Sequence, residues 1–418
     1  MKLAVVGGGS TYTPELIDGL VRMRELLRVE ELALHDPAAD RLGVVGGLAG
    51  RMLARGDHSA KLMLTGRLED AIEGADAVLI QLRVGGQAVR IVDESVPLAC
   101  GCLGQETTGY GGLAKALRTV PVVLEIAERV RELAPRAWIV DFTNPVGIVT
   151  KALLDAGHKS VGLCSAAMVF QRHFAHVLDV DPPRVELDHI GLNHLTWEVA
   201  VRVDGVEVLP QLLGEHVDRV APATGLPAEL VKRLGVIPSY YLHYFYEHDA
   251  VVEHQREHGS RAEEVAEIER QLLSLYADES LSEKPELLGR RGGAFYSEAA
   301  VELLASLFGP GPNPRHVVNI RNNGALPFLA DDAVVEVPAR VAPDGLTSVD
   351  VPGLSPVHRG LVAHVSAYEE LALDAALHGG RERVFRALLA HPLIGQADVA
   401  EQLATRMIEA NREFLAWA

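Results

Sequence analysis

Cysteine and long apolar runs are both scarce in this chain of 418 residues. Its three cysteines, Cys100, Cys102 and Cys164, are too few for a disulfide framework and are typical of a reducing compartment. No apolar run reaches the roughly 18 residues needed to cross a bilayer, so we expect no membrane association. Strand-like residues begin at Lys2, which leaves no room for a signal peptide and predicts a cytoplasmic protein.

Positive charge is also in short supply, since 39 Lys and Arg face 57 Asp and Glu, for a net charge of −18. A surface this negative repels phosphodiester backbones, which argues against nucleic acid as a partner. A small anionic ligand is still compatible with the sequence, because a few arginines at close range outweigh a diffuse field of opposite sign.

The first half of the chain alternates between apolar strand patterns and helical periodicity. Strands are predicted at 2–6, 31–36, 61–64, 77–82, 138–142 and 160–164, and helices at 13–27, 40–54 and 113–133. Such alternation predicts an α/β fold with a doubly wound parallel sheet. The glycine-rich segment 83–112 interrupts the rhythm, and a segment of that length after a strand is more often functional than idle.

The pattern changes after Gly191. Segment 197–208 alternates around Asp204-Gly205, which predicts a hairpin, and the remainder is mainly helical with strands at 317–321 and 334–341. At about 150 residues per domain, the length allows two to three domains, and the change of pattern is taken to separate two. We place them at 1–194 and 195–418, and no Ser-, Pro- or Gly-rich spacer separates them.

A glycine-rich turn follows the first predicted strand and leads into the first helix. Its residues are Gly7, Gly8, Gly9, Ser10, Thr11 and Tyr12. Backbone amides in such a turn can approach the pyrophosphate of a dinucleotide such as NAD, although Tyr12 replaces the usual third glycine. Asp36 ends the second strand, where an acid can accept hydrogen bonds from a ribose. The alternatives are a plain turn without ligand and a helix cap made by Asp36.

Three more polar side chains are predicted where later strands end, at the edge where open α/β sheets bind ligands. Asn144 can bond a sugar hydroxyl or a nicotinamide ribose, or simply form a turn before Pro145. Cys164 and His194 follow what we expect to be neighbouring strand ends. They can share a metal ion, but the spacing alone favours a buried cysteine and a satisfied histidine.

Four of the nine tyrosines fall within seven positions, at Tyr240, Tyr241, Tyr244 and Tyr246. Tyrosine rings bury large areas and satisfy their hydroxyls locally, so an aromatic packing cluster is the first interpretation.

Taken together, several segments resemble the glycoside hydrolases of family 4, and among them the 6-phospho-β-glucosidases. The segments that carry this resemblance are residues 7–16, Arg83-Val84-Gly85-Gly86 with Arg90, residues 104–109, Thr143-Asn144-Pro145, Cys164, Gly191-Leu192-Asn193-His194 and residues 291–297. The resemblance implies a Rossmann-like, lactate/malate dehydrogenase-like domain at 1–194 that binds NAD. It also implies a mainly helical α+β domain at 195–418 for substrate binding and oligomerisation, in a homodimer or homotetramer.

The resemblance also implies roles for individual residues. Cys164 and His194 become ligands of a divalent metal, usually manganese, whose other positions are filled by substrate hydroxyls and water. Tyr241 becomes the catalytic base. The implied cofactor contacts are Gly7, Gly9, Ser10, Thr11 and Asp36, and the implied substrate contacts are Arg90 at the sugar 6-phosphate, Asn144, Asn193 and Arg291.

The implied reaction is hydrolysis by a redox route. NAD⁺ takes hydride from C3 of the sugar, Tyr241 removes the C2 proton, the C1 substituent is eliminated, water adds, and NADH returns the hydride. Ser165 follows Cys164 where α-acting relatives often carry an acidic residue, which favours a β-glycoside. The alternatives are a glycosidase of unphosphorylated sugars, a 2-hydroxy-acid dehydrogenase and a non-catalytic NAD-bound sugar sensor.

Overall fold

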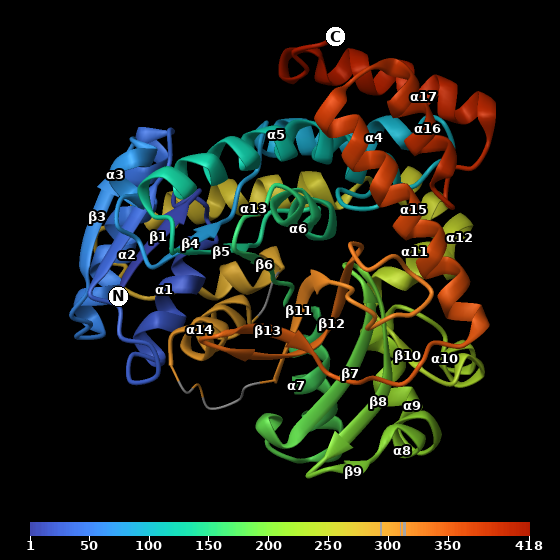
Figure 1. Cartoon of the computed structure of the whole chain (residues 1–418), viewed down its shortest axis with the longest axis horizontal. Helices are drawn as coiled ribbons and strands as arrows, with labels where there is room; N and C mark the ends of the chain where they lie inside the picture. The colour runs from blue at the N-terminus through green and yellow to red at the C-terminus, as the bar shows by residue number, and fades with distance from the viewer. Residues whose placement is uncertain (293–294, 310, 312–314) are drawn as a thin grey trace.

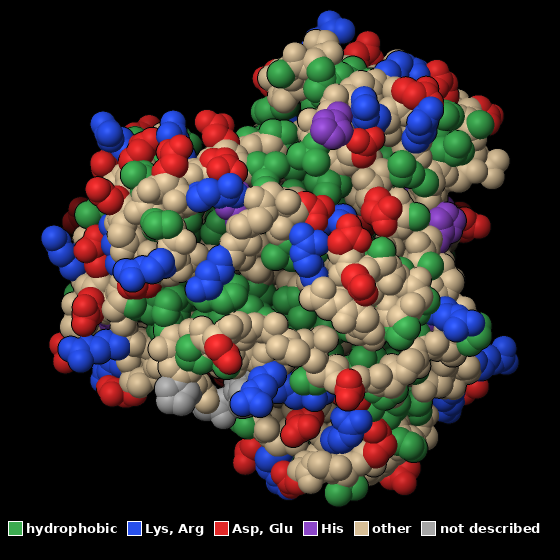
Figure 2. Space-filling model, in the orientation of Figure 1, with side chains coloured by type: hydrophobic (Ala, Val, Ile, Leu, Met, Phe, Trp, Pro, Cys, Tyr) green, Lys and Arg blue, Asp and Glu red, His purple; other side chains and the backbone are tan. Residues whose placement is uncertain are grey.

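The computed structural model describes residues 1–292, 295–309, 311 and 315–418. Gly293 and Ala294, which belong to the segment 291–297 of the family resemblance, lie outside the described residues. Within the described part of the chain, no helix is long and apolar enough to cross a membrane. On the face drawn in Figure 2, acidic and basic side chains are interspersed.

The first half of the chain forms a parallel sheet in the order β3-β2-β1-β4-β5-β6. Its strands are β1 (Lys2–Val6), β2 (Glu31–His35), β3 (Lys61–Thr65), β4 (Ala77–Ile80), β5 (Trp138–Asp141) and β6 (Ser160–Gly162). Helices cover both faces of such a sheet, so its central strands read as continuous apolar runs rather than alternating patterns. This is the dinucleotide-binding strand order, and the predicted Rossmann-like fold is confirmed.

Helices connect these strands in two layers (Figure 1). The helices of the first half are α1 (Thr13–Arg22), α2 (Ala39–Arg55), α3 (Leu68–Ile72), α4 (Gly86–Leu98), α5 (Gly109–Leu133), α6 (Val146–Asp155) and α7 (Ala166–Leu178). Helix α1 contacts α2, and α5 contacts both α3 and α6.

The second half extends the same sheet with antiparallel strands, beyond β6 in the order β11-β12-β7-β8-β10. The strands are β7 (Val185–Leu192), β8 (Leu195–Val203), β9 (Val206–Glu207), β10 (Ile237–Pro238), β11 (Arg315–Arg321), β12 (Val334–Ala342) and β13 (Gly345–Ser348). The hairpin predicted at Asp204-Gly205 joins β8 to β9, and both turn residues have the positive φ angles, 50° and 80°, that such tight turns require. The predicted domain boundary falls between β7 and β8 and stays a prediction.

The remaining helices pack partly on this extension and partly on the helices of the first half. They are α8 (Leu209–Gly214), α9 (Val217–Val220), α10 (Ala228–Leu234), α11 (His243–Tyr246), α12 (His248–His258), α13 (Arg261–Tyr276), α14 (Tyr296–Phe308), α15 (Pro356–His378), α16 (Arg381–Ala390) and α17 (Ala397–Asn411). Short 3₁₀ helices are η1 (Pro182–Arg184), η2 (Ala221–Thr224), η3 (Tyr240–Leu242), η4 (Glu286–Arg291) and η5 (Arg412–Phe414). Helices α15 and α17 pack on α5 (Figure 1), while α13 packs on α2 and α4.

Two expectations need correction. Strands β6 and β7 are not neighbours, because β11 and β12 pair between them, so Cys164 and His194 do not follow adjacent strands. Segment 83–112 is also more regular than its glycines suggest, since it contains α4 and the start of α5.

Candidate active site

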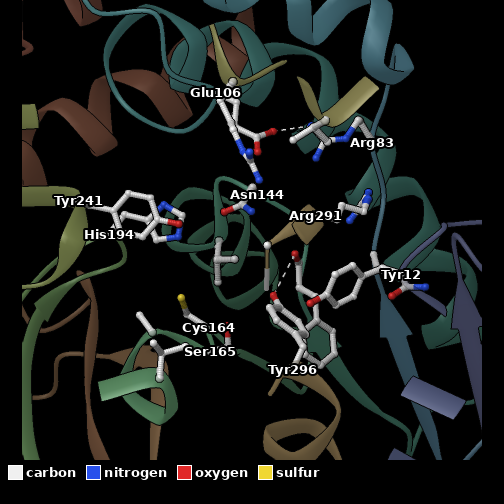
Figure 3. A pocket seen from close by; sticks show the side chains of 18 of the residues that line it. Tyr12, Arg83, Glu106, Asn144, Cys164, Ser165, His194, Tyr241, Arg291 and Tyr296 are labelled. Carbon is white, nitrogen blue, oxygen red and sulfur yellow. Dashed lines mark hydrogen bonds and ion pairs between the residues drawn. The ribbon is translucent and has the colours of Figure 1, made fainter. Parts of the chain in front are cut away.

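A cavity of about 400 Å³ opens at the carboxyl ends of the parallel strands. Side chains that directly follow four of these strands line it, namely Ser10 after β1, Leu82 after β4, Asn144 after β5 and Cys164 after β6. Figure 3 shows this cavity with Tyr12 and Tyr296 on one side and the stacked rings of Tyr241 and His194 on the other. Its position is the one where open α/β sheets bind ligands.

The glycine-rich turn packs too tightly for side chains. A Cβ on Gly7, whose φ is +90°, would lie 2.4 Å from the Gln81 carbonyl oxygen, and one on Gly8 would lie 2.8 Å from Leu34 Cβ. The Thr13 hydroxyl donates to the Gly8 carbonyl at 2.8 Å, which fixes the entry of the chain into α1. The turn therefore presents bare backbone at the N-terminus of α1, as a pyrophosphate requires.

Asp36 lies beside this turn, after β2. One carboxylate oxygen accepts from the Gly9 backbone N–H at 3.1 Å, and the other accepts from the Ala38 backbone N–H at 3.0 Å. Both bonds hold the carboxylate in place while each oxygen keeps a second lone pair for a ribose hydroxyl. The alternative, in which Asp36 caps the next helix, is not what the structure shows, since Ala38 is the N-cap of α2 and has no side-chain cap bond. The ribose contact of Asp36 stays a prediction.

A cluster of cations lines the cavity around one carboxylate. Glu106 contacts Arg83, accepts from Lys115 Nζ at 2.7 Å and lies 3.4 Å from Arg90 Nη1. Burial alone would raise the pKa of Glu106, but the three cations hold it well below its ordinary value. Burial and the nearby Arg83 lower the pKa of Lys115 to about 7. Arg90 also pairs with Glu94, so three cations face two carboxylates, and one positive charge is left for an anionic substrate when Lys115 is protonated.

Two buried polar atoms in the cavity lining have no hydrogen-bond partner among the described residues. They are Asn144 Oδ1 and Arg291 Nε. The Arg291 guanidinium lies 5.2 Å from the centre of the Tyr12 ring and 3.9 Å from Glu269. An unsatisfied buried donor or acceptor costs about 1–3 kcal/mol, so both positions favour a polar ligand.

His194 presents a defined nitrogen to the cavity. The Thr107 hydroxyl donates its one proton to Gln105 Oε1 at 2.9 Å, so it accepts from His194 Nδ1 at 2.8 Å. The lone pair is therefore on His194 Nε2. Burial lowers the pKa of His194 to about 4, which keeps the ring neutral near pH 7. A neutral imidazole with its other nitrogen donating is the usual form of a metal ligand.

Cys164 lines the same cavity and is a free thiol. Burial raises its pKa, and Glu336 adds to the effect, so the thiol is protonated without a cation nearby. A divalent cation would displace that proton, because coordinated thiols are deprotonated. No group of three or more His, Cys, Asp and Glu side chains is arranged to hold a metal within the ranges described. Cys164 and His194 would thus supply two ligands, leaving the others to oxygen donors from a substrate or water.

Tyr241 stacks directly on His194, with ring centroids 3.5 Å apart and planes inclined by 8°. Burial raises the pKa of Tyr241 well above its ordinary value, and Cys164 and Tyr244 add to the effect. The packing interpretation of the tyrosine cluster holds for Tyr244 and Tyr246, but Tyr241 also faces the cavity.

Asn193 is placed differently from the other predicted substrate contacts. Its amide donates to Glu336 Oε2 at 2.7 Å, and it lines a small separate cavity behind His194. Its predicted contact with substrate stays a prediction.

Sequence reasoning gave no role to Thr107, Lys115 or Tyr296, although Thr107 and Tyr296 lay in segments of the resemblance. A lysine among the small and apolar residues at the start of α5 was the available signal for Lys115. Nothing local distinguishes Tyr296, whose hydroxyl donates to the Leu163 carbonyl at 3.2 Å below the cavity.

The fold is of the dehydrogenase-like α/β class, and its polar cavity lies beside the glycine-rich turn. Malate dehydrogenase from Aeropyrum pernix shares the fold at a TM-score of 0.56 and 13% identity. Family models for the family 4 glycosyl hydrolases match residues 2–180, and those for their C-terminal domain match residues 189–394. The chain therefore belongs to glycosyl hydrolase family 4, and the resemblance drawn from its motifs is confirmed.

Two relatives illustrate the likeness. A Bacillus subtilis (strain 168) protein named "Probable 6-phospho-beta-glucosidase" is 39% identical over 99% of this chain and 97% of its own. The 6-phospho-beta glucosidase from Thermotoga maritima, solved with manganese, NAD+ and glucose-6-phosphate, matches at a TM-score of 0.91 and 33% identity, covering 99% of both chains.

Proposed function

We propose that this chain hydrolyses 6-phospho-β-glucosides, using NAD and a divalent metal, Mn²⁺, as cofactors. One cavity brings together Ser10 of the dinucleotide turn, the Cys164 and His194 side chains, Tyr241 and the cation cluster around Glu106. This observation carries the proposal. The relative from Thermotoga maritima, solved with manganese, NAD+ and glucose-6-phosphate, supports the same set of ligands.

The residues present fit both cofactors. The bare backbone of the glycine turn and the carboxylate of Asp36 suit the pyrophosphate and ribose of NAD. The neutral His194 and the thiol of Cys164 suit a divalent cation, which would lower the pKa values of groups around it. Sulfur is a soft ligand for a hard ion such as Mn²⁺, so the identity of the metal rests on the family relationship.

The substrate is proposed to span the cavity from the cations to Tyr241. Arg90 is held by Glu94 at 2.7 Å and would contact the 6-phosphate, with Arg291 as a further substrate contact. The Asn144 Oδ1 atom would accept from a ring hydroxyl. Ser165 lies beside Cys164 in the cavity lining and carries no acidic group, which supports a β-glycoside.

The cofactors supply a hydride acceptor for C3 and a Lewis acid for the oxygens on C2 and C3. Loss of hydride makes C3 a ketone and acidifies the proton on C2. Tyr241 removes that proton, since its ring is held against His194 and its hydroxyl faces the cavity. The C1 substituent then leaves, water adds, and return of the hydride gives net hydrolysis without net change of NAD.

A panel of nitrophenyl α- and β-glucosides, with and without 6-phosphate, tests the proposal in the presence of NAD⁺, Mn²⁺ and a thiol reductant. We expect turnover of the β-glucoside 6-phosphate, with kcat/KM about ten- to a hundredfold above that of the unphosphorylated sugar. NADH should not accumulate. Steady NADH formation from a 2-hydroxy acid would indicate a dehydrogenase instead, and binding without turnover would indicate a sensor.

The variant Arg90→Ala tests the phosphate contact. It should remove most of the preference for phosphate, whereas Arg129→Ala, which removes an exposed arginine on α5, should leave the ratio unchanged. If the wild type prefers the neutral sugar, the protein is a glycosidase of unphosphorylated sugars acting by the same chemistry.

We also propose a cytoplasmic homodimer or homotetramer, as the family resemblance implies. Analytical ultracentrifugation of the purified protein measures the oligomeric state, and a monomer at micromolar concentration would refute this assignment.

A further inference from the structure

One wall of the active-site cavity is apolar, in contrast to the cation cluster. It is formed by Val169 and Phe170 of α7, Ala223 of η2 and Tyr240 of η3, which we call the apolar wall. Two of its side chains are strongly exposed for their type, Tyr240 at 50% and Val169 at 39%. Exposed apolar surface that lines a cavity is typical of a ligand-binding site.

The apolar wall is held together by contacts beneath it. Phe170 and Ala223 belong to one hydrophobic cluster between α7 and η2. The Tyr240 ring lies against the backbone of Gly225, where an added Cβ would be 3.1 Å from a ring carbon, and its centroid is 4.3 Å from that of His243. The ring is therefore supported on one side while half of its surface stays open.

The proposed chemistry directs the leaving group toward this wall. C3 must face the dinucleotide turn near Tyr12, and C2 must face Tyr241, which lies on the opposite side of the cavity in Figure 3. In the sugar ring C2 is bonded to both C1 and C3, so C1 lies on the far side of C2 from C3. The substituent on C1 thus leads from Tyr241 toward its neighbour Tyr240, whose ring centroid is 6.3 Å from that of Tyr241.

The four side chains of the apolar wall together carry a single polar atom, the Tyr240 hydroxyl. A second sugar unit placed there would lose water from several hydroxyls and regain few hydrogen bonds. An aromatic ring would instead stack on Tyr240 and bury its edges against Val169 and Phe170. We infer that this chain is specific for aryl β-glucoside 6-phosphates, with the apolar wall as the aglycone subsite, an inference that rests on the proposed function.

The test compares kcat/KM for phenyl and methyl β-glucoside 6-phosphate in the wild type, Tyr240→Ala and Tyr240→Phe. Phenol is the better leaving group in every variant, so the change in the phenyl-to-methyl ratio between variants isolates the contact with the wall. We expect Tyr240→Ala to lower this ratio about tenfold and Tyr240→Phe to keep it, because the ring carries the interaction. Val169→Thr, which exchanges a methyl group for a hydroxyl, should lower it by a smaller factor.

The variant Trp417→Ala is the matched control, because Trp417 is an exposed aromatic at the chain end that does not line the cavity. It should leave the ratio at its wild-type value. An unchanged ratio in Tyr240→Ala would overturn the inference while the proposed function stands. Preferred turnover of β-1,4-linked diglucose phosphorylated on its non-reducing unit would also overturn it, in favour of a sugar aglycone. If the wild type turns over neither glucoside 6-phosphate, the proposed function fails and this inference fails with it.

Discussion

The hydroxyl of Thr107 decides which nitrogen of His194 can bind a metal. Its proton goes to Gln105, and the Thr107 backbone N–H also points to Gln105, so the amide oxygen is the acceptor for both. The hydroxyl then accepts from His194 Nδ1 and leaves Nε2 without a proton. Residues outside the direct ligand set often control metal affinity in this way, by fixing the tautomer and orientation of the ligand.

Thr107→Val should therefore weaken metal binding while the protein stays folded. The change keeps the shape of the side chain and removes the acceptor for His194 Nδ1, so the loss in Mn²⁺ affinity should be about 10- to 100-fold. Titration of Mn²⁺ followed by calorimetry measures it directly. Thr107→Ser retains the hydroxyl and is expected to bind metal nearly as the wild type does. Equal affinities for all three proteins would show that Thr107 does not position the ligand.

Tyr241→Phe separates the two roles of this tyrosine. The ring remains, so stacking on His194 and folding should survive, but the group that takes the C2 proton is lost. We expect kcat to fall by about a hundredfold or more. In deuterium oxide the wild type should place deuterium at C2 of the product, as mass spectrometry can detect. Absence of deuterium from the wild-type product would remove the elimination route.

The sequence predicted some of the residues that line the cavity and missed others. Arg90, Asn144, Cys164, His194 and Tyr241 all line the same cavity, although their roles stay predictions. Thr107 could not be assigned, because its function depends on a contact with His194, 87 positions away, that no local pattern encodes. Lys115 is similar, since a buried lysine becomes meaningful only once Glu106 and Arg83 are known to surround it.

At the scale of elements, Glu94 joins α4 to α13. One carboxylate oxygen accepts from Arg90 Nε at 2.7 Å, one turn earlier in α4, and the other accepts from the backbone N–H of Ala262 at 2.9 Å, in the first turn of α13. Free N–H groups at a helix start need such partners. One buried carboxylate thus orients the proposed phosphate contact and fixes the beginning of a helix.

Glu94→Gln should destabilise the protein and weaken phosphate recognition together. The amide keeps the size of the side chain but removes the charge that pairs with Arg90, so the free energy of unfolding should fall by about 1.5–3 kcal/mol. The KM for the glucoside 6-phosphate should rise more than that for the neutral sugar. Urea unfolding and steady-state kinetics give the two values. Glu263→Gln, an exposed change in the same first turn, is the control, and an equal loss of stability there would contradict the role of Glu94.

Elements with regular patterns were predictable and α4 was not. Helix α2 and the strands β1 and β2 follow plain periodicity and appear within a residue or two of their predicted ends. Helix α4 begins with Gly86, contains Pro97 and buries Arg90, Asp93 and Glu94, so it lacks the apolar stripe of a surface helix. Asp93 pairs with Arg118 on α5 and Glu94 accepts from Ala262 on α13, and neither partner is in the segment itself.

Over the whole molecule, the parallel and antiparallel halves form one sheet, which the sequence did not predict. The junction pairs Asn319 with Gly162 and is a single antiparallel contact between β11 and β6. Strands β7, β8 and β12 are joined further on by a buried charge network. His189 Nδ1 bonds Glu198 at 2.6 Å, and its Nε2 bonds Glu336 at 2.9 Å. The pairs Asn319–Gly162 and His189–Glu336 each join residues more than a hundred positions apart, which no local pattern encodes.

The charge state of His189 should make stability depend on pH. Burial lowers its pKa, but Glu198 and Glu336 overcome this and raise it to about 10. The folded protein therefore keeps this proton between about pH 6.5 and pH 10, while the unfolded chain loses it. The contribution of His189 to stability is fully present below about pH 6.5 and is lost as the pH rises through 10.

Lys115 changes stability in the opposite direction over the same pH range, because its pKa is lowered to about 7. The test therefore compares the free energy of unfolding of two proteins, the wild type and a variant of His189, so that the effect of Lys115 cancels. We expect the free energy of unfolding of the wild type, minus that of His189→Gln, to fall by up to about 1.4 kcal/mol per pH unit between pH 7 and pH 9. Urea unfolding at each pH supplies both values, and His216→Gln, at a half-buried histidine outside the network, should show no such slope. A difference that stays flat across this range would contradict the uptake of a proton that depends on His189, because the slope counts the protons bound on folding.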